Sequence, residues 1–213
     1  MIKLIIANKR YSSWSLRPWI FLRQFDVSFE EVLLDMGKPE FGTFLAKHMS
    51  NRKVPLLIDD GLEVWDSLAI IEYVNENYLA GKGWPADKKA RAVARSVSAE
   101  MHSSFSALRQ ECGHDVSREH VPKDVSAQCL KDVERINQIW EYCRKNYGKG
   151  GPFLFGAFSA ADAMFAPVVN RIVSYDLKTG DTAKDYIKAV RAIPAHQEFI
   201  ADGKKEPILA DHV

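Results

Sequence analysis

The sequence is poor in cysteine and in metal-ligand patterns, and each shortage excludes a class of protein. Three cysteines, Cys112, Cys129 and Cys143, stand far apart and form no C-x-x-C pair, which argues against a disulfide framework and against a zinc site. The six histidines include no H-E-x-x-H pattern and no pair at i, i+4. We therefore expect no metal, and we assign the cysteines to core packing.

The net charge is also close to zero, and the sequence has no long apolar run. The chain carries 29 Lys and Arg against 28 Asp and Glu, a net charge of +1, so neither nucleic acid nor an anionic membrane is the expected partner. The N-terminal MIKLIIANKR has only a short apolar run before charges return, too short for a signal peptide. No stretch of about 18 apolar residues could span a bilayer. We expect a soluble, cytoplasmic protein.

The first eighty residues alternate between strand-like and helix-like segments. Apolar residues recur at helical spacing from Leu16 to Phe25, and Asp60-Gly61 is a hairpin turn signal between two strand-like runs. The expected strands are residues 3–8, the second half of 28–35, 54–59 and 62–65, and further helices are expected over 41–48 and 67–78. The order β-α-β-α-β-β-α is typical of a thioredoxin-like sheet.

After residue 85 the pattern becomes helical throughout. Two long helical stretches are expected between Asp87 and Tyr147, broken near residues 113–122, and helices resume at Ser159, Asp181 and Pro194. We place the boundary in GKGWP (81–85). This gives an α/β thioredoxin-like domain over residues 1–81 and an all-helical domain over residues 86–213.

The loop RYSSWSLRPW (10–19) lies where a thioredoxin-like fold places its reactive group, between the first strand and the first helix. A helix N-terminus presents unpaired N–H groups and a partial positive charge, which stabilise an anion such as a thiolate. The loop has Ser12-x-x-Ser15 where redox members have C-x-x-C. A hydroxyl forms no disulfide, but it can donate a hydrogen bond to a substrate thiolate; helix capping is the alternative role.

Two further dipeptides suit a peptide-like ligand. A cis bond at Val54-Pro55 would expose the backbone N–H and C=O of Val54 for antiparallel pairing, whereas a trans proline at a strand's first position is the ordinary alternative. Asp66-Ser67 precedes a helix, where both residues could act as caps. Ser67 could also hold a carboxylate there and Asp66 an ammonium group, the two charges of an α-amino acid.

These motifs, in this order, resemble the cytosolic glutathione S-transferase family over essentially the whole chain. The resemblance is carried by S-S-x-S-x-R, then K-V-P, then D-S-L-A-I-I-E-Y (66–73), and by FSAADAMFAPVV (158–169), which matches the family's S/T-x-x-D capping element at Ser159 and Asp162. It is nearest to serine-type members of the zeta, tau and theta classes, and to bacterial ones. It implies glutathione as co-substrate, a hydrophobic electrophile as second substrate and a homodimer.

The resemblance also implies roles for individual residues. Ser12 matches the serine that hydrogen-bonds the glutathione sulfur, with Ser13 beside it, and Tyr11 is the rival donor because some classes use a tyrosine. Val54 matches the residue whose backbone pairs with the cysteinyl part of glutathione. Asp66 and Ser67 match the pair that holds its γ-glutamyl end, and Lys38 resembles a lysine that reaches the glycyl carboxylate.

The second substrate is expected against the first helix of the helical domain, where Met101, His102, Phe105 and Arg109 share one face or its edge. Glutathione transfer is the expected activity. A glutathione-dependent isomerase or peroxidase, or a binding module without turnover, are the alternatives. The zeta isomerases have cysteine where this chain has Trp14, and glutamine where it has Asp66, which disfavours the isomerase.

Overall fold

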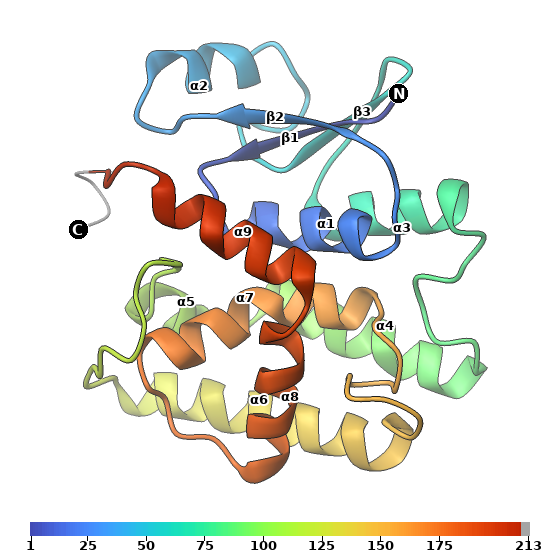
Figure 1. Cartoon of the computed structure of the whole chain (residues 1–213), viewed down its shortest axis with the longest axis vertical. Coiled ribbons are helices and arrows are strands. Elements are labelled where there is room, and N and C mark those ends of the chain that lie inside the picture. Colours follow the sequence, from blue (N-terminus) through green and yellow to red (C-terminus); the bar gives the residue numbers. More distant parts are fainter. Residues whose placement is uncertain (210–213) are drawn as a thin grey trace.

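Four short strands form one mixed sheet at the N-terminal end of the chain (Figure 1). The fold is taken from a computed structural model that describes residues 1–209. The strands are β1 (Lys3–Ala7), β2 (Glu30–Leu34), β3 (Leu56–Asp59) and β4 (Leu62–Val64), in the order β2-β1-β3-β4. β1 pairs parallel to β2 and antiparallel to β3, and β3 pairs antiparallel to β4.

Three helices cover the two faces of this sheet. α1 (Ser13–Gln24) and α3 (Ser67–Tyr78) lie on one face and α2 (Pro39–Leu45) lies on the other (Figure 1). The alternation of β1 accounts for this, because Leu4 and Ile6 join the main core while Ile5 packs with Leu45 of α2 and Leu56 of β3. The predicted β-α-β-α-β-β-α order is confirmed.

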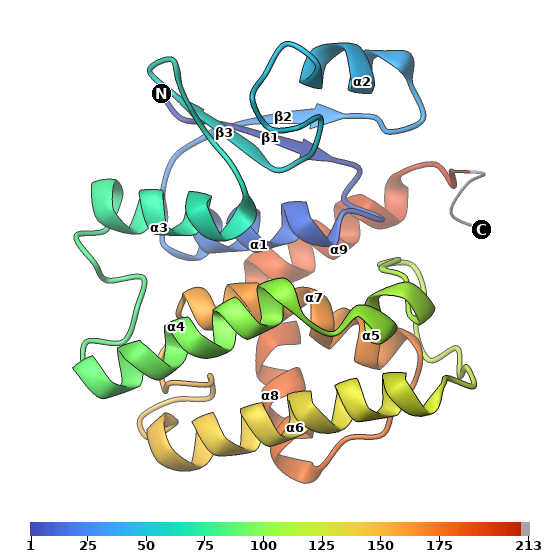
Figure 2. The same cartoon turned by 180° about the vertical axis from the view of Figure 1, so that it is seen from behind.

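The rest of the described chain is helical, and it packs beneath α1 and α3 (Figure 2). Its helices are α4 (Lys88–Ser103), α5 (Ser106–Glu111), α6 (Ala127–Tyr147), α7 (Ala160–Ser174), α8 (Asp181–Arg191) and α9 (Pro194–Lys205). Helix α7 is buried along almost its whole length and packs against both α1 and α4. The predicted capping element is confirmed, since Ser159 and Asp162 bond reciprocally at its start.

One helix prediction is wrong. The first helix after residue 85 does not continue to Arg109, because α4 ends at Ser103 and α5 begins at Ser106. Between them Phe105 has a backbone φ of 65°, in the left-handed region that no α-helix continues through. Met101 and His102 therefore lie on α4 and Arg109 on α5, and these residues do not share one helix face.

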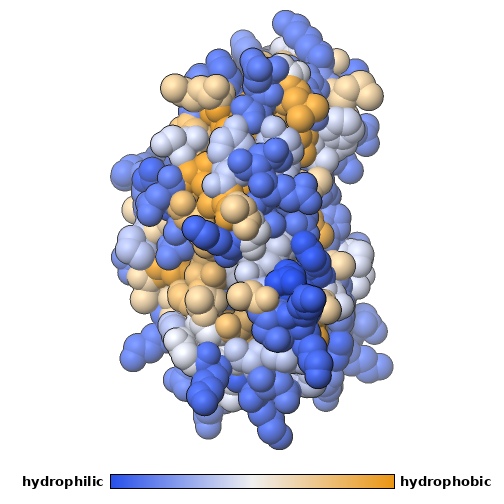
Figure 3. Space-filling model, turned by 90° about the vertical axis from the view of Figure 1, so that its right-hand side faces the viewer, coloured by the Kyte–Doolittle hydropathy of each residue, from blue (hydrophilic) through white to orange (hydrophobic). Residues whose placement is uncertain are grey.

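The surface is polar with scattered apolar residues. On the face drawn in Figure 3, hydrophobic patches are separated by hydrophilic side chains. Among the described residues, no helix is long and apolar enough to cross a membrane. The positions of the domain boundaries, 1–81 and 86–213, stay a prediction.

Candidate functional site

The loop from Asn8 to Ser15 is ordered by a short chain of hydrogen bonds. The Asn8 carbonyl accepts the N–H groups of Tyr11 at 3.1 Å and of Ser12 at 2.9 Å, so the loop turns tightly out of β1. The Oγ atoms of Ser12 and Ser15 lie 2.7 Å apart, and Ser12 Oγ also accepts the Ser15 N–H at 3.3 Å as the N-cap of α1. The N–H of Ala7 donates to Ser15 Oγ at 3.2 Å.

This arrangement determines what the Ser12 hydroxyl can do. When Ser15 donates its proton to Ser12, Ser12 Oγ accepts two hydrogen bonds and keeps its own proton for a third group. The group that receives this proton lies at the positive end of α1, which has no acidic residue in its first turn. An anion such as a thiolate is the partner that both features favour.

Val54 lies just before β3, and its bond to Pro55 is cis. Its side chain is half-buried against the small core cluster that contains Ile5 and Leu56. Within residues 1–209, neither its backbone N–H nor its C=O has a hydrogen-bond partner. Both groups are thus available to an extended ligand.

Asp66 and Ser67 form the start of α3, and a helical-domain residue reaches them. Asp66 Oδ1 accepts the N–H of Leu68 at 3.1 Å, while Oδ2 is bonded to the His102 imidazole from α4. The Ser67 side chain is fully buried, and Arg17 of α1 points a terminal nitrogen at its Oγ from 3.5 Å. His102, predicted on the second-substrate side, therefore borders the predicted γ-glutamyl site.

Trp14 connects these groups. The guanidinium carbon of Arg17 lies 4.1 Å from the centre of the Trp14 ring, and the guanidinium carbon of Arg109 lies 5.0 Å from the same centre. The His102 ring packs edge-on against Trp14, with ring centres 5.3 Å apart. Residues of α1, α3, α4 and α5 thus meet around the first turn of α1. In Figure 2 the end of α4 lies directly beneath α1.

Of the other predicted residues, Lys38 and Ser13 have no side-chain contact with this group in the described chain, and Met101 and Phe105 meet it through their backbone carbonyls, which accept N–H groups of Arg109. Lys38 is exposed at the N-cap position of α2, and its ammonium lies 4.0 Å from Asp35. Phe105 and Met101 are buried members of the main core. Ser13 is buried beside Ser12, and its hydroxyl has no bonded partner in residues 1–209.

Tyr11, the rival thiol donor, is buried, and its hydroxyl oxygen accepts the N–H of Leu209 at 3.3 Å. The C-terminal segment thus engages this hydroxyl, whereas that of Ser12 faces Ser15. The choice between Ser12 and Tyr11 stays a prediction.

Sequence reasoning missed three buried polar residues. Asn8 shapes the serine loop, and its Oδ1 also accepts the N–H of Met36 at 2.7 Å. Arg17 and Arg171 are nearly inaccessible to solvent, and burial with neighbouring arginines lowers the pKa of both, for Arg171 to about 10. The position of Arg17 just after the S-S-x-S motif could have indicated that it belongs to the site. No sequence pattern marks Arg171.

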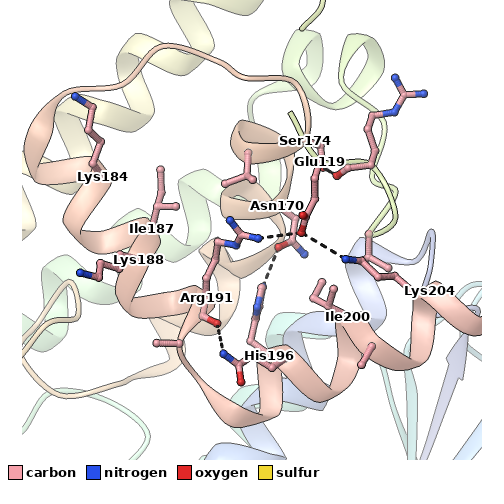
Figure 4. A pocket seen from close by; sticks show the side chains of 16 residues that line it. Glu119, Asn170, Ser174, Lys184, Ile187, Lys188, Arg191, His196, Ile200 and Lys204 are labelled. Carbon is pink, nitrogen blue, oxygen red and sulfur yellow. Dashed lines mark hydrogen bonds and ion pairs between the residues drawn. The ribbon is translucent and has the colours of Figure 1, made fainter. Parts of the chain in front are cut away.

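A separate cavity of about 710 Å³ lies between α7, α8 and α9 and contains none of the predicted site residues (Figure 4). Arg191 and Lys204 pair there with Glu119, at 2.9 and 3.5 Å. At its floor the Nε2 of His196 donates to Asn170 Oδ1 at 2.8 Å. In residues 1–209 there is no group of three His, Cys, Asp or Glu side chains that could hold a metal ion.

The sequence and the fold of this chain are similar to those of known proteins. Residues 3–76 match the family described as the N-terminal domain of glutathione S-transferase. Glutathione S-transferase U16 of Arabidopsis thaliana is 28% identical over 163 residues, which are 75% of this chain and 67% of that protein. Maleylacetoacetate isomerase of Rattus norvegicus is 25% identical over 194 residues, 87% of this chain and 85% of that protein.

Among solved structures, a glutathione transferase homolog from Burkholderia with bound glutathione superposes with a TM-score of 0.71 at 22% identity. The superposition covers 97% of this chain and 99% of that one. A mixed four-stranded sheet followed by a helical domain is therefore the glutathione S-transferase fold. Residues 3–76 therefore belong to the family of glutathione S-transferase N-terminal domains, and the chain as a whole has the glutathione S-transferase fold.

Proposed function

We propose that this protein is a glutathione transferase in which Ser12 stabilises the thiolate of bound glutathione. The observation that carries the proposal is the Ser12 hydroxyl at the start of α1, backed by Ser15, which itself accepts the Ala7 N–H. The thiolate attacks an electrophilic carbon of the second substrate. A bond from sulfur to carbon forms, the leaving group departs with its electron pair, and the thiol proton goes to solvent.

Three anchor points would hold the tripeptide. The unpaired backbone groups of Val54 pair with the cysteinyl unit, and Asp66 and Ser67 at the start of α3 hold the γ-glutamyl ammonium and carboxylate. Arg17, whose terminal nitrogen points at Ser67 Oγ, adds a second donor for that carboxylate. Lys38 would reach the glycyl carboxylate from α2, and Ser13 lines the sulfur loop.

The energetic effect expected of Ser12 is moderate. A hydrogen bond to a charged group contributes about 1.5–3 kcal/mol, which corresponds to a thiol pKa lowered by about one to two units. Starting from an ordinary thiol pKa of about 8.5, this raises the thiolate fraction at neutral pH several-fold. The second substrate and a homodimer stay predictions made from the family resemblance, and a cytoplasmic location stays a prediction made from the sequence.

The test is a titration of bound glutathione. Thiolate absorbance is followed against pH in wild type, in Ser12→Ala and in the control Ser96→Ala, which removes a hydroxyl from the exposed face of α4. Wild type and the control are expected to show the lowered thiol pKa, and Ser12→Ala to lose most of that shift. A thiol pKa that is unshifted in wild type contradicts the proposal, and a shift that survives in Ser12→Ala moves the role to Tyr11.

A further inference from the structure

The cavity between α7, α8 and α9 is lined by no residue of the proposed glutathione site (Figure 4). Its volume of about 710 Å³ lies in the range of cavities that hold small organic molecules, roughly 300–1,000 Å³. Its lining has five basic side chains and one acidic side chain, so we call it the basic cavity. The charged lining residues are Arg118, Glu119, Lys184, Lys188, Arg191 and Lys204.

The carboxylates of the described chain do not neutralise this lining. Arg191 and Lys204 share a single carboxylate, that of Glu119, and they reach it from opposite sides (Figure 4). Within residues 1–209, neither Arg118 nor Lys188 forms an ion pair with a carboxylate. Two cations are thus without a partner and two others share one, so the lining keeps more positive charge than one negative group would offset.

Helix α8 gathers its cations on the face that lines the cavity. Lys184, Ile187, Lys188 and Arg191 recur at i, i+3, i+4 and i+7, the spacing of one helix face. Like charges four residues apart destabilise a helix, so Lys184 and Lys188 disfavour each other. Asp181 offsets only the first of them, at 2.8 Å from the Lys184 ammonium. An anion in the cavity would relieve this repulsion.

The cations lie on two sides of an aliphatic middle. In Figure 4, Lys184 and Lys188 of α8 lie on one side of the cavity and Lys204 of α9 lies on the other. Ile187 and Ile200 lie between them. Among the lining residues in the described part of the chain, none is aromatic. This arrangement suits a ligand with a negative group at each end and a saturated carbon chain between.

The floor of the basic cavity adds no negative charge. His196 and Asn170 are buried there, and their side chains bond each other at 2.8 Å. Burial and the charge of Arg191 lower the pKa of His196 to about 4, so its ring is neutral at pH 7. The positive lining is therefore not opposed from below.

We infer that the basic cavity binds an aliphatic dicarboxylate, whose two carboxylates meet the cations on either side of Ile187 and Ile200. A carboxylate suits both kinds of cation, because it can accept two parallel hydrogen bonds from an arginine or pair with the compact charge of a lysine. The cations are partly exposed to water, so each ion pair contributes at most about fivefold in affinity. The inference goes beyond the proposed transferase function and does not depend on it.

The test compares three compounds of one chain length and different charge, which are octanedioate, octanoate and octanamide. Calorimetry at pH 7 and low salt is expected to rank their affinities in that order, with about fivefold between successive compounds. The double variant Lys184→Gln/Lys188→Gln removes the cations of one side. It is expected to bring the affinity for octanedioate within about twofold of that for octanoate and to leave octanamide binding unchanged.

A second variant acts in the opposite direction. Glu119→Gln frees Arg191 and Lys204 from their internal carboxylate, so octanedioate should bind about fivefold tighter while octanamide binds as before. The matched control is Lys131→Gln, which removes an exposed lysine of α6 that lies outside the cavity lining. It should keep the wild-type affinities for all three compounds.

Equal affinity of wild type for the three compounds overturns the inference, as does a ranking that both variants leave unchanged. Equal binding of octanoate and octanedioate shows that only one end of the cavity holds an anion, which contradicts a dicarboxylate. Saturating S-methylglutathione is expected to leave the affinity for octanedioate within about twofold. Loss of octanedioate binding in its presence would put the dianion in the glutathione site and refute the separate cavity site.

Discussion

At the scale of single residues, this protein buries several polar side chains and keeps most of them neutral. His196, Asn170 and His114 form one row, in which His196 Nε2 donates to Asn170 Oδ1 and Asn170 Nδ2 bonds His114 Nε2 at 3.1 Å. Burial lowers the pKa of His196 to about 4 and that of His114 well below its ordinary value. The row requires a neutral His114, whose Nε2 accepts from Asn170, and burial favours the neutral form of His196.

This row predicts a loss of stability in mild acid. The pKa of His196 is about 4 in the folded protein and about 6.5 in the unfolded chain, so between these values the unfolded chain binds the extra proton. The stabilising contribution is present above pH 6.5 and is lost as the pH falls toward 4. From pH 7 to pH 5, the free energy of unfolding from urea titration should fall by about 2 kcal/mol more in wild type than in His196→Gln.

The control for this prediction is His120→Asn, because His120 is largely exposed and paired with Asp176 at the surface. This variant should keep the wild-type pH dependence. An identical pH dependence in wild type and His196→Gln would show that His196 is not a buried neutral histidine.

At the scale of elements, caps determine where the functional helices begin. Ser12, Asp66, Asp87 and Ser159 each cap the helix that follows, and the first two are also the proposed ligand contacts. The Ser159–Asp162 box is the most buried of these. Asp162 accepts the N–H of Leu154 at 3.0 Å and the N–H and hydroxyl of Ser159 at 2.9 and 3.0 Å.

Removal of the Asp162 carboxylate should be costly. Asp162→Ala leaves three buried donors without an acceptor, so the free energy of unfolding should fall by about 3 kcal/mol or more. Asp87→Ala is the matched comparison, because this exposed cap accepts one N–H, that of Ala90 at 2.8 Å, and should cost about 1 kcal/mol. Urea denaturation of both variants measures the difference, and equal losses would contradict the special role of the buried box.

At the scale of the whole molecule, the sheet and the helical domain share one core. A single cluster of buried side chains runs from Leu4 of β1 through Trp19 of α1 to Met101 of α4, Phe165 of α7 and Phe199 of α9. Trp19 meets Phe199 edge-on with ring centres 5.2 Å apart. The proposed substrate sites lie along this same junction.

A shared core predicts cooperative unfolding of the two parts. In urea, tryptophan fluorescence and far-ultraviolet circular dichroism should report one coincident transition, because separation of α1 from α7 and α9 exposes apolar surface on both sides. Two separated transitions would show that the sheet domain is stable without the helices.

Much of this architecture could be predicted from local sequence. Alternation in residues 3–8, the Asp60-Gly61 turn and the caps at Ser159 and Asp66 act over a few residues, so the elements that they specify are found where they are expected. The break at Phe105 could not be predicted in this way. Periodicity continues across it, and a left-handed φ at a phenylalanine depends on the burial of its side chain in the surrounding core.

The sequence by itself determined the strand and helix order and the serine loop at a helix start. These follow from hydrogen bonding and apolar patterning between near neighbours along the chain. Tertiary structure alone decided that His102 bonds Asp66 and that Arg17 and Arg109 lie on Trp14. Those contacts join residues that are far apart in sequence, so they exist only once α1, α3, α4 and α5 have packed together.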